Sequence, residues 1–492
     1  MSATPLAARP PAASSALARV LGRADLVLFS LSAILTIDTL ASAASVGVSW
    51  FAWWAVTLVV FFVPYALMSA ELGSAWPQEG GLYVWVREGL GARAGSLAAW
   101  FYWINNAYWM PSVYLVFAAT FRQIFLDAET VERLAARGLV TWLDAGVAIL
   151  LTWITVAIGV VRLGISKWVP NLGAVVKVAI FVALGALGFA WLAQGRAPAN
   201  DFSLGQLAPR LSDSLVFLPV LLYNALGFEL VSGAGGEMKD PQRDVPRAVL
   251  LTGALVAAVY ALGVLGILLA VPLERLSLVT GTWDALLALG EGSGSTAHGL
   301  VLLLGLGFLY ACVANIVTWS LGTNRVAAAA AAEGSLPSAL GRLHPRHGTP
   351  HVAFAVTGAL STALLVGNAG FAASSDNAFW LIFKLSSLCF LFTYLLVFPA
   401  FALLRVRRPE VPRPYRMPGG DRAGIAAAVC CTAVVAVACA LFFRPAPNAD
   451  LAAAARENAL LAAECLATLA VGLFLLPRGR RPPAAIATTE EV

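Results

Sequence analysis

The sequence contains little charge. Only 12% of its 492 residues are Asp, Glu, Lys or Arg, whereas 60% are hydrophobic. So small a polar fraction cannot cover the surface of a soluble globular protein of this length. Mean hydropathy is +0.80, and nearly uncharged runs repeatedly reach the roughly 20 residues that cross a bilayer as a helix. Because a chain in lipid must satisfy its own backbone hydrogen bonds, the composition predicts an all-α polytopic membrane protein.

Histidine and cysteine are also scarce, with four and six residues. The cysteines form no CxxC pair, and the chain carries neither an HExxH nor a GxSxG motif. We therefore expect no metal site, no cofactor and no enzymatic activity. A basic run from Arg405 to Arg416 is expected to contact anionic lipid, not nucleic acid.

Twelve apolar segments are long enough to be membrane spans. They cover residues 26–46, 50–72, 96–121, 140–161, 169–193, 215–236, 248–271, 299–321, 352–368, 378–404, 425–443 and 460–476. Placing both termini inside puts twenty-two of the thirty-two Lys and Arg residues in cytoplasmic segments, which is where basic residues concentrate. The prediction is a multi-pass protein of a bacterial-type inner (plasma) membrane with both termini cytoplasmic.

Four loop segments contain Gly, Pro and charged residues. They are AELGSAWPQEGGLYVWVREGLG at 70–91, GEMKDPQRDVPRA at 236–248, NRVAAAAAAEGSLP at 324–337 and RVRRPEVPRPYRMPGG at 405–420. Together they resemble the loops of the amino acid, polyamine and organocation transporter superfamily. The run EGGLYVWV at 79–86 and the acid Asp38 are similar, more weakly, to the bacterial glutamate/GABA antiporter branch.

This resemblance implies a LeuT-like fold, in which two five-helix repeats of inverted topology, with broken helices 1 and 6, are followed by two extra helices. The transport core would cover 25–404, with repeats at about 25–195 and 212–404. A basic cytoplasmic loop at 405–424 would precede helices 11 and 12 at 425–477, and residues 1–24 and 478–492 would be disordered cytoplasmic tails.

Four charged residues fall well inside predicted spans, where a charge is costly unless it faces a cavity or a partner. Asp38 and Glu229 lie in spans one and six, and Lys177 and Lys384 lie in spans five and ten. Each expected repeat thus has an acid in its first helix and a lysine in its fifth. We interpret these residues as functional, although two structural ion pairs would also explain them.

Polar and glycine-rich stretches indicate where spans one and six unwind. The substrate-binding residues expected there, together with residues expected to line the cavity, are Thr36, Asp38, Thr39, Ser42, Asn106, Tyr223, Gly227, Glu229, Asn315 and Lys384. In loops, Glu71, Arg87, Glu88, Asp244 and Arg247 are candidates for the ion pairs of a cytoplasmic gate, or are solvated charges.

The resemblance also implies roles for particular residues. Lys177 matches a lysine of sodium-independent members, whose ammonium stands where sodium-coupled relatives hold a cation. Burial disfavours a charged lysine, which gives a route to proton coupling. Glu229 matches an acid that senses protonation after the break in helix six, and Tyr223 matches an aromatic residue that covers the substrate.

Asp38 departs from the family pattern, because a GSG-like run usually binds the substrate carboxylate there. A carboxylate at this place would repel an amino acid unless it is protonated or is neutralised by Lys384 or Lys177. We therefore expect Asp38 and Lys384 to compensate one another across the cavity. The alternative is that Asp38 binds the amine of the substrate directly.

The predicted function is a sodium-independent secondary active amino acid transporter, working by proton-coupled symport or exchange. The alternative is an exchanger of polyamines or of decarboxylated amines such as GABA, and an ion channel is a different class that also uses buried charges. The expected partners are a small amino acid or amine, protons and the lipid bilayer, and the sequence leaves the oligomeric state open.

Overall fold

The computed structural model describes residues 21–161, 163–209, 218–291, 294–370, 375–445 and 450–476. Most of the predicted tails, residues 1–20 and 478–492, lie outside these ranges. Within them the regular elements are helices, and one isolated parallel bridge joins Leu21 to Met238. The helices are α1 (Arg23–Ile34), η1 (Ile37–Thr39), α2 (Leu40–Ala44), α3 (Trp50–Thr57), η2 (Leu58–Phe62), α4 (Val63–Ala75), α5 (Leu82–Leu90), α6 (Ala92–Phe125), α7 (Ala128–Ala136), α8 (Val140–Val160), α9 (Leu163–Ser166), α10 (Trp168–Ala193), α11 (Leu204–Leu207), α12 (Leu218–Tyr223), η4 (Leu230–Glu237), α13 (Pro241–Ala270), η5 (Leu273–Arg275), α14 (Gly281–Gly290), α15 (Gly294–Ala332), η6 (Ser338–Gly341), α16 (His351–Ala369), α17 (Ser375–Arg407), α18 (Gly420–Leu441) and α19 (Leu451–Leu475).

Ten helical segments of the described chain are long and apolar enough to cross a membrane. They coincide with ten of the twelve predicted spans. The third predicted span is α6, a continuous helix of 34 residues, whose buried polar residues, including Asn105 and Asn106, lower its hydropathy. The sixth predicted span is interrupted between α12 and η4. Neither segment therefore has the simple apolar signature of a spanning helix.

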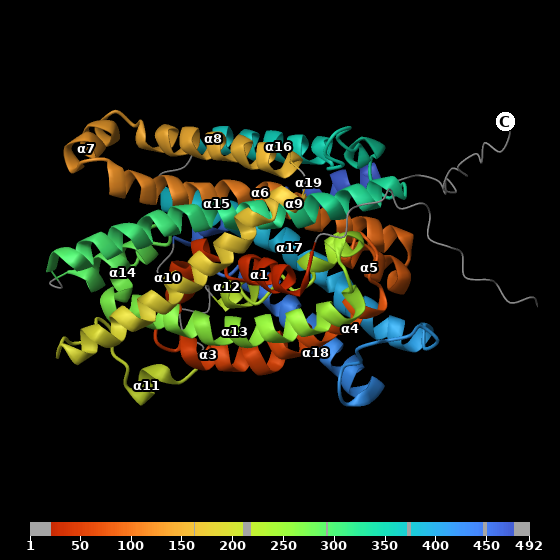
Figure 1. Ribbon diagram of the computed structural model, residues 1–492. Helices are drawn as coiled ribbons and strands as arrows, with labels where there is room; N and C mark the ends of the chain where they lie inside the picture. The colour runs from red at the N-terminus through yellow and green to blue at the C-terminus, as the bar shows by residue number, and fades with distance from the viewer. Residues whose placement is uncertain are drawn as a thin grey trace, which may run out of the picture.

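The long helices lie side by side in one bundle (Figure 1). The segment from α1 to α2 runs through the interior, with 89% of its most apolar stretch buried, whereas α18 and α19 are 28% and 22% buried. Helix α17 packs along α6, and α8 pairs with α16 at one edge of the bundle. Helices α4, α13 and α18 lie towards the opposite edge. The arrangement places the first membrane segment in the interior of the bundle, where residues 29–44 are buried.

The outer surfaces of the peripheral helices are apolar. Val59, Leu303 and Leu466 are 74%, 64% and 65% exposed, and they lie on different helices. A soluble protein rarely exposes apolar surface in broad bands, because water penalises it. These side chains therefore face the acyl chains of the bilayer.

Candidate functional site

The first membrane segment is broken near its middle, as the polar stretch predicts. Helix α1 ends at Ile34, after which Leu35 (φ −74°, ψ 84°) and Thr36 (φ −82°, ψ 97°) leave helical geometry and η1 begins. Side chains of other helices satisfy the freed backbone groups. The hydroxyl of Tyr260 donates to the carbonyl of Ile34 at 3.0 Å and accepts from the amide of Thr36 at 2.9 Å. A backbone group left unpaired in lipid is costly. The hydrogen bonds of Tyr260 therefore stabilise the broken conformation of this segment.

The second break lies between Tyr223, which ends α12, and η4. Gly227 has φ +124° there, a conformation that side chains with a Cβ rarely adopt. The amides of Gly227 and Phe228 both donate to the hydroxyl oxygen of Tyr65 at 3.1 Å.

Glu229 is the last residue of this break and is buried. Its carboxylate accepts from the hydroxyls of Tyr102, at 2.8 Å, and of Tyr65. Tyr65 therefore connects the backbone of the break to the acid. Sequence reasoning identified Glu229 and missed both tyrosines, since a tyrosine in an apolar span gives no signal that distinguishes a ligand from packing.

Asn224 joins the two breaks and was also missed. Its Oδ1 accepts hydrogen bonds from the hydroxyls of Thr36 at 2.9 Å and of Thr39 at 2.6 Å. Its Nδ2 is buried and has no hydrogen-bond partner among the described residues. The signal available in the sequence was an amide side chain in an apolar run, LYNALGF, nine residues before the glycine-rich stretch that begins at Gly233.

Asp38 lies directly after the first break and is 2% exposed. Two neutral donors bind its carboxylate: Nε1 of Trp109 to Oδ2 at 3.2 Å and Nδ2 of Asn315 to Oδ1 at 2.9 Å. The other end of the Asn315 amide accepts from Nζ of Lys177 at 2.6 Å. Among the described residues no Lys or Arg forms a direct ion pair with Asp38, and the amide of Asn315 is hydrogen-bonded to both Asp38 and Lys177.

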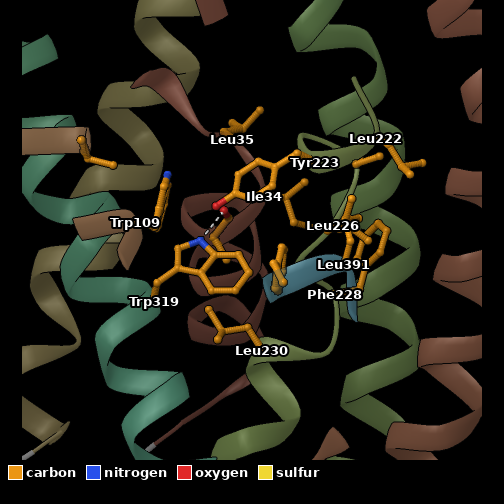
Figure 2. Packing of buried hydrophobic residues seen from close by; sticks show 14 of the residues in the cluster. Ile34, Leu35, Trp109, Leu222, Tyr223, Leu226, Phe228, Leu230, Trp319 and Leu391 are labelled. Atoms are coloured by element: carbon orange, nitrogen blue, oxygen red, sulfur yellow. Dashed lines mark hydrogen bonds between the residues drawn. The ribbon is translucent and has the colours of Figure 1, made fainter. Parts of the chain in front are cut away.

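Aromatic rings pack beside the end of helix α1 (Figure 2). The ring centroids of Trp109 lie 5.8 Å from those of Trp319 and 6.1 Å from those of Tyr223. Phe390 packs edge-on against Tyr223 and Trp319, at 5.4 and 5.1 Å. Figure 2 shows Trp109, Tyr223 and Trp319 beside Ile34 and Leu35, where helix α1 ends. The structure thus packs aromatic side chains beside the first break, and one of them, Trp109, donates a hydrogen bond to Asp38.

Three predicted residues remain, namely Ser42, Asn106 and Lys384. Ser42 is buried on α2, and Asn106 donates to Ser320 at 3.1 Å from α6. Lys384 instead donates to Glu457 of α19 at 2.5 Å, beside a recess of about 70 Å³. The prediction that Lys384 compensates Asp38 is wrong, because its ammonium is already paired with an acid that lies outside the expected repeats.

The predicted gate charges form ion pairs, with different partners. Glu71 contacts Arg405, and it also contacts Arg413 at 3.0 Å. The remaining pairs are Arg87 with Glu88 and Glu333, Glu88 with Arg408, and Asp244 with Arg23. Arg247 is exposed and forms no ion pair with a described residue. These contacts fasten helix ends and loops on the side of the bundle that carries the basic loop.

Interrupted helices that face each other in a membrane bundle, with charged residues at the interruptions, are typical of secondary transporters. A family model described as amino acid permease matches residues 21–470. The chain therefore belongs to the amino acid permease family, within the amino acid, polyamine and organocation superfamily.

Curated relatives are carriers of amines and amino acids. The chain is 31% identical over 396 residues to a probable agmatine/putrescine antiporter of Lactococcus lactis, covering 80% of this chain and 82% of that protein. It is 27% identical over 389 residues to a polyamine transporter of rice, covering 78% and 66%. A glutamate/γ-aminobutyrate antiporter of Lactococcus lactis is 24% identical over 375 residues, covering 73% and 71%. The protein is accordingly a transporter and not an enzyme.

The fold recurs in a solved structure. The manganese transporter of Eremococcus coleocola aligns with a TM-score of 0.60 over 95% of this chain and 96% of its own, at 12% identity. At that identity the likeness concerns the fold alone.

Proposed function

We propose that this protein is a sodium-independent secondary active transporter that exchanges organic amines across the membrane by alternating access. The observation that carries the proposal is Asp38, a buried carboxylate at the first helix break, which only neutral donors bind within the described chain. A protonated amine complements this place, because the carboxylate supplies the opposite charge and the faces of Trp109 and Trp319 attract cations. Amine carriers among the relatives support the same choice.

The charges of the centre agree with a cationic substrate. Asp38 and Glu229 are carboxylates and Lys177 is the one lysine hydrogen-bonded to this group of residues. With all three ionised, the centre carries one net negative charge. A substrate with one ammonium at the site neutralises it, whereas a zwitterion leaves it unchanged and brings a second carboxylate towards Asp38.

The sodium independence rests on Lys177. Its ammonium donates to the carbonyl of Ser32 at 2.5 Å as well as to Asn315. A carbonyl at the end of a half-helix is a ligand that a sodium ion would otherwise use. An ammonium bound there fills the place and supplies a proton that can leave during the cycle.

We infer the wider architecture from the same elements. Helix α6 and the interrupted pair α12–η4 complete twelve spans, and the breaks near Thr36 and Gly227 correspond to each other in two inverted five-helix repeats, about 25–195 and 212–404. The basic loop at 405–424 lies in the cytoplasm with both termini, in keeping with the distribution of Lys and Arg. Helices α18 and α19, at the edge of the bundle, are the two additions to the repeats.

Counterflow in proteoliposomes tests the proposed substrate class. Vesicles preloaded with unlabelled putrescine or agmatine should accumulate the labelled amine, and Asp38→Asn should abolish this while leaving folded protein. Asp144→Asn is the matched control, because Asp144 is equally buried but pairs with Arg122 in α6. Counterflow of neutral amino acids with no counterflow of amines would reject the proposal.

A second candidate is exchange of an amino acid for its own decarboxylated amine. Asn224 favours it, since its buried Nδ2 lies between the breaks without a partner among the described residues, and it could donate to a substrate carboxylate. Vesicles preloaded with an amine should then take up the parent amino acid, and Asn224→Leu should weaken the acid more than the amine.

A further inference from the structure

The recess beside Lys384 lies between α16, α17 and α19, and neither broken segment lines it. Its volume is about 70 Å³, several times the roughly 10 to 15 Å³ that one water molecule needs. Leucine or isoleucine side chains from all three helices form most of its wall, and the polar side chains in it are Asn368, Lys384, Glu457 and Glu464. Apolar walls around charged groups suit an amphiphilic ligand.

The charged groups of this recess do not balance. Nζ of Lys384 donates to Oε1 of Glu457 at 2.5 Å, so this ammonium and this carboxylate compensate each other. Glu464 follows Glu457 by seven positions in α19, which is about two helical turns and places both acids on one face. The Glu464 carboxylate is partly exposed and forms no hydrogen bond or ion pair with another described residue. With all three groups ionised, the recess carries one net negative charge.

The recess borders the lipid-facing surface of α19. Leu460, which lines the recess, is 56% exposed, and Leu466 on the same helix is 65% exposed. A carboxylate beside such side chains is costly unless a cation compensates it. A soluble ion has to leave water to reach this place, whereas a phospholipid carries its ammonium on a molecule that already lies in the bilayer.

The level of these residues fits a lipid headgroup. Helix α17 has 33 residues and is about 50 Å long, so it extends beyond a hydrocarbon core of about 30 Å. With the excess shared between its ends, Lys384, about 14 Å from the start of α17, lies near the boundary between acyl chains and headgroups. Side chains of a helix lean towards its N-terminus, so Glu464 is directed towards the same end of the bundle.

We propose that this recess binds the headgroup of a phospholipid with a primary ammonium, such as phosphatidylethanolamine. The ammonium donates to Glu464 and to the amide oxygen of Asn368, whose Nδ2 donates to the carbonyl of Leu364 at 3.0 Å. Lys384 has three N–H donors and uses one for Glu457, so it can also bind the phosphate of the lipid. The acyl chains then lie along the exposed leucines of α19.

Charge and hydrogen bonding select this class of phospholipid. An anionic lipid such as phosphatidylglycerol brings a further negative charge to a recess that is already negative. Phosphatidylcholine has the same net charge as phosphatidylethanolamine, but its quaternary ammonium has no N–H to donate. Hydrogen bonds to a charged acceptor are stronger than neutral ones, so the recess prefers the primary ammonium.

The test titrates the delipidated full-length protein in detergent with dioleoyl forms of the three lipids and counts bound lipid by native mass spectrometry. The first phosphatidylethanolamine should bind about tenfold more tightly than phosphatidylcholine, because a charge-assisted hydrogen bond distinguishes them. Glu464→Leu should remove this preference, and Glu464→Gln, which keeps the shape, is the second variant. Thr432→Val is the matched control, a partly buried hydroxyl on the peripheral helix α18 that donates to the carbonyl of Ala428 at 2.7 Å, and it should keep the preference.

Each outcome bears on the proposal. A preference for phosphatidylethanolamine that is lost in the Glu464 variants and kept in Thr432→Val supports it. Equal binding of phosphatidylethanolamine and phosphatidylcholine, tighter binding of phosphatidylglycerol, or an unchanged preference in the Glu464 variants overturns it. Displacement of the bound lipid by putrescine also overturns it, because the recess would then be an accessory site for a free amine. The proposed transport of amines does not depend on any of these results.

Discussion

Glu71 on α4 is a buried carboxylate at the centre of an ionic network. Arg405 contacts it with two nitrogens, Arg413 lies at 3.0 Å, and the amide of Met417 donates to it at 2.8 Å. The side chains of Glu71 and Arg405 are each only 1% exposed. The substitution Glu71→Gln keeps the shape and removes the only full counter-charge that is buried with these two guanidinium groups in the described chain.

Removing one partner of a buried pair costs about 3 to 5 kcal/mol, because the other charge remains desolvated. We expect a value near the lower limit, since Arg405 retains the carbonyl of Gly420 at 2.6 Å and a 3.4 Å contact with Asp421. That cost corresponds to roughly a hundredfold change in the unfolding equilibrium. It should appear as a lower midpoint in thermal unfolding of the detergent-solubilised protein, followed by thiol labelling of buried cysteines such as Cys431.

Arg416→Gln is the control, because the Arg416–Asp421 pair is about half exposed on both sides and exposed pairs contribute little. The double variant Glu71→Gln with Arg405→Gln should lose less than the sum of the two single losses. A midpoint for Glu71→Gln as high as that of Arg416→Gln would refute the reasoning. So would strict additivity in the double variant.

Three further predictions concern charges in the membrane. Lys177→Ala should remove the pH dependence of amine uptake while folded protein persists, and an unchanged pH profile would contradict its role. Replacing sodium by choline should leave the uptake rate unaltered, whereas a large loss would show sodium coupling. Glu457→Gln should lower the unfolding midpoint more than Lys384→Met. The Lys384 side chain is 8% exposed and the Glu457 side chain is 34% exposed, so the ammonium left without a partner is the more desolvated charge. Equal midpoints for the two variants would show that this difference in burial has no consequence.

The sequence alone determined the class of protein and the places where its helices break. Apolar runs of spanning length leave a chain no alternative to helices in lipid, and ten of the twelve predicted spans have that apolar signature in the structure. The break after Ile34 and the break before Leu230 occur where polar or glycine residues interrupt apolar runs. The loop motifs also identified the superfamily, because Gly and Pro at particular positions are required by the local backbone conformation of these loops.

Only the tertiary structure decided which charges meet. Lys177 and Asn315 are 138 positions apart in the chain, and Lys384 and Glu457 are 73 apart. Helical periodicity indicates which face of a helix a residue occupies, but not which helix lies opposite that face. The expected pairing of Asp38 with Lys384 is therefore wrong, because packing put a neutral amide against Asp38 and an acid of α19 against Lys384. Burial also determined the partners of the other buried charges, because a desolvated charge is stabilised by the donor or acceptor that lies nearest to it in the bundle.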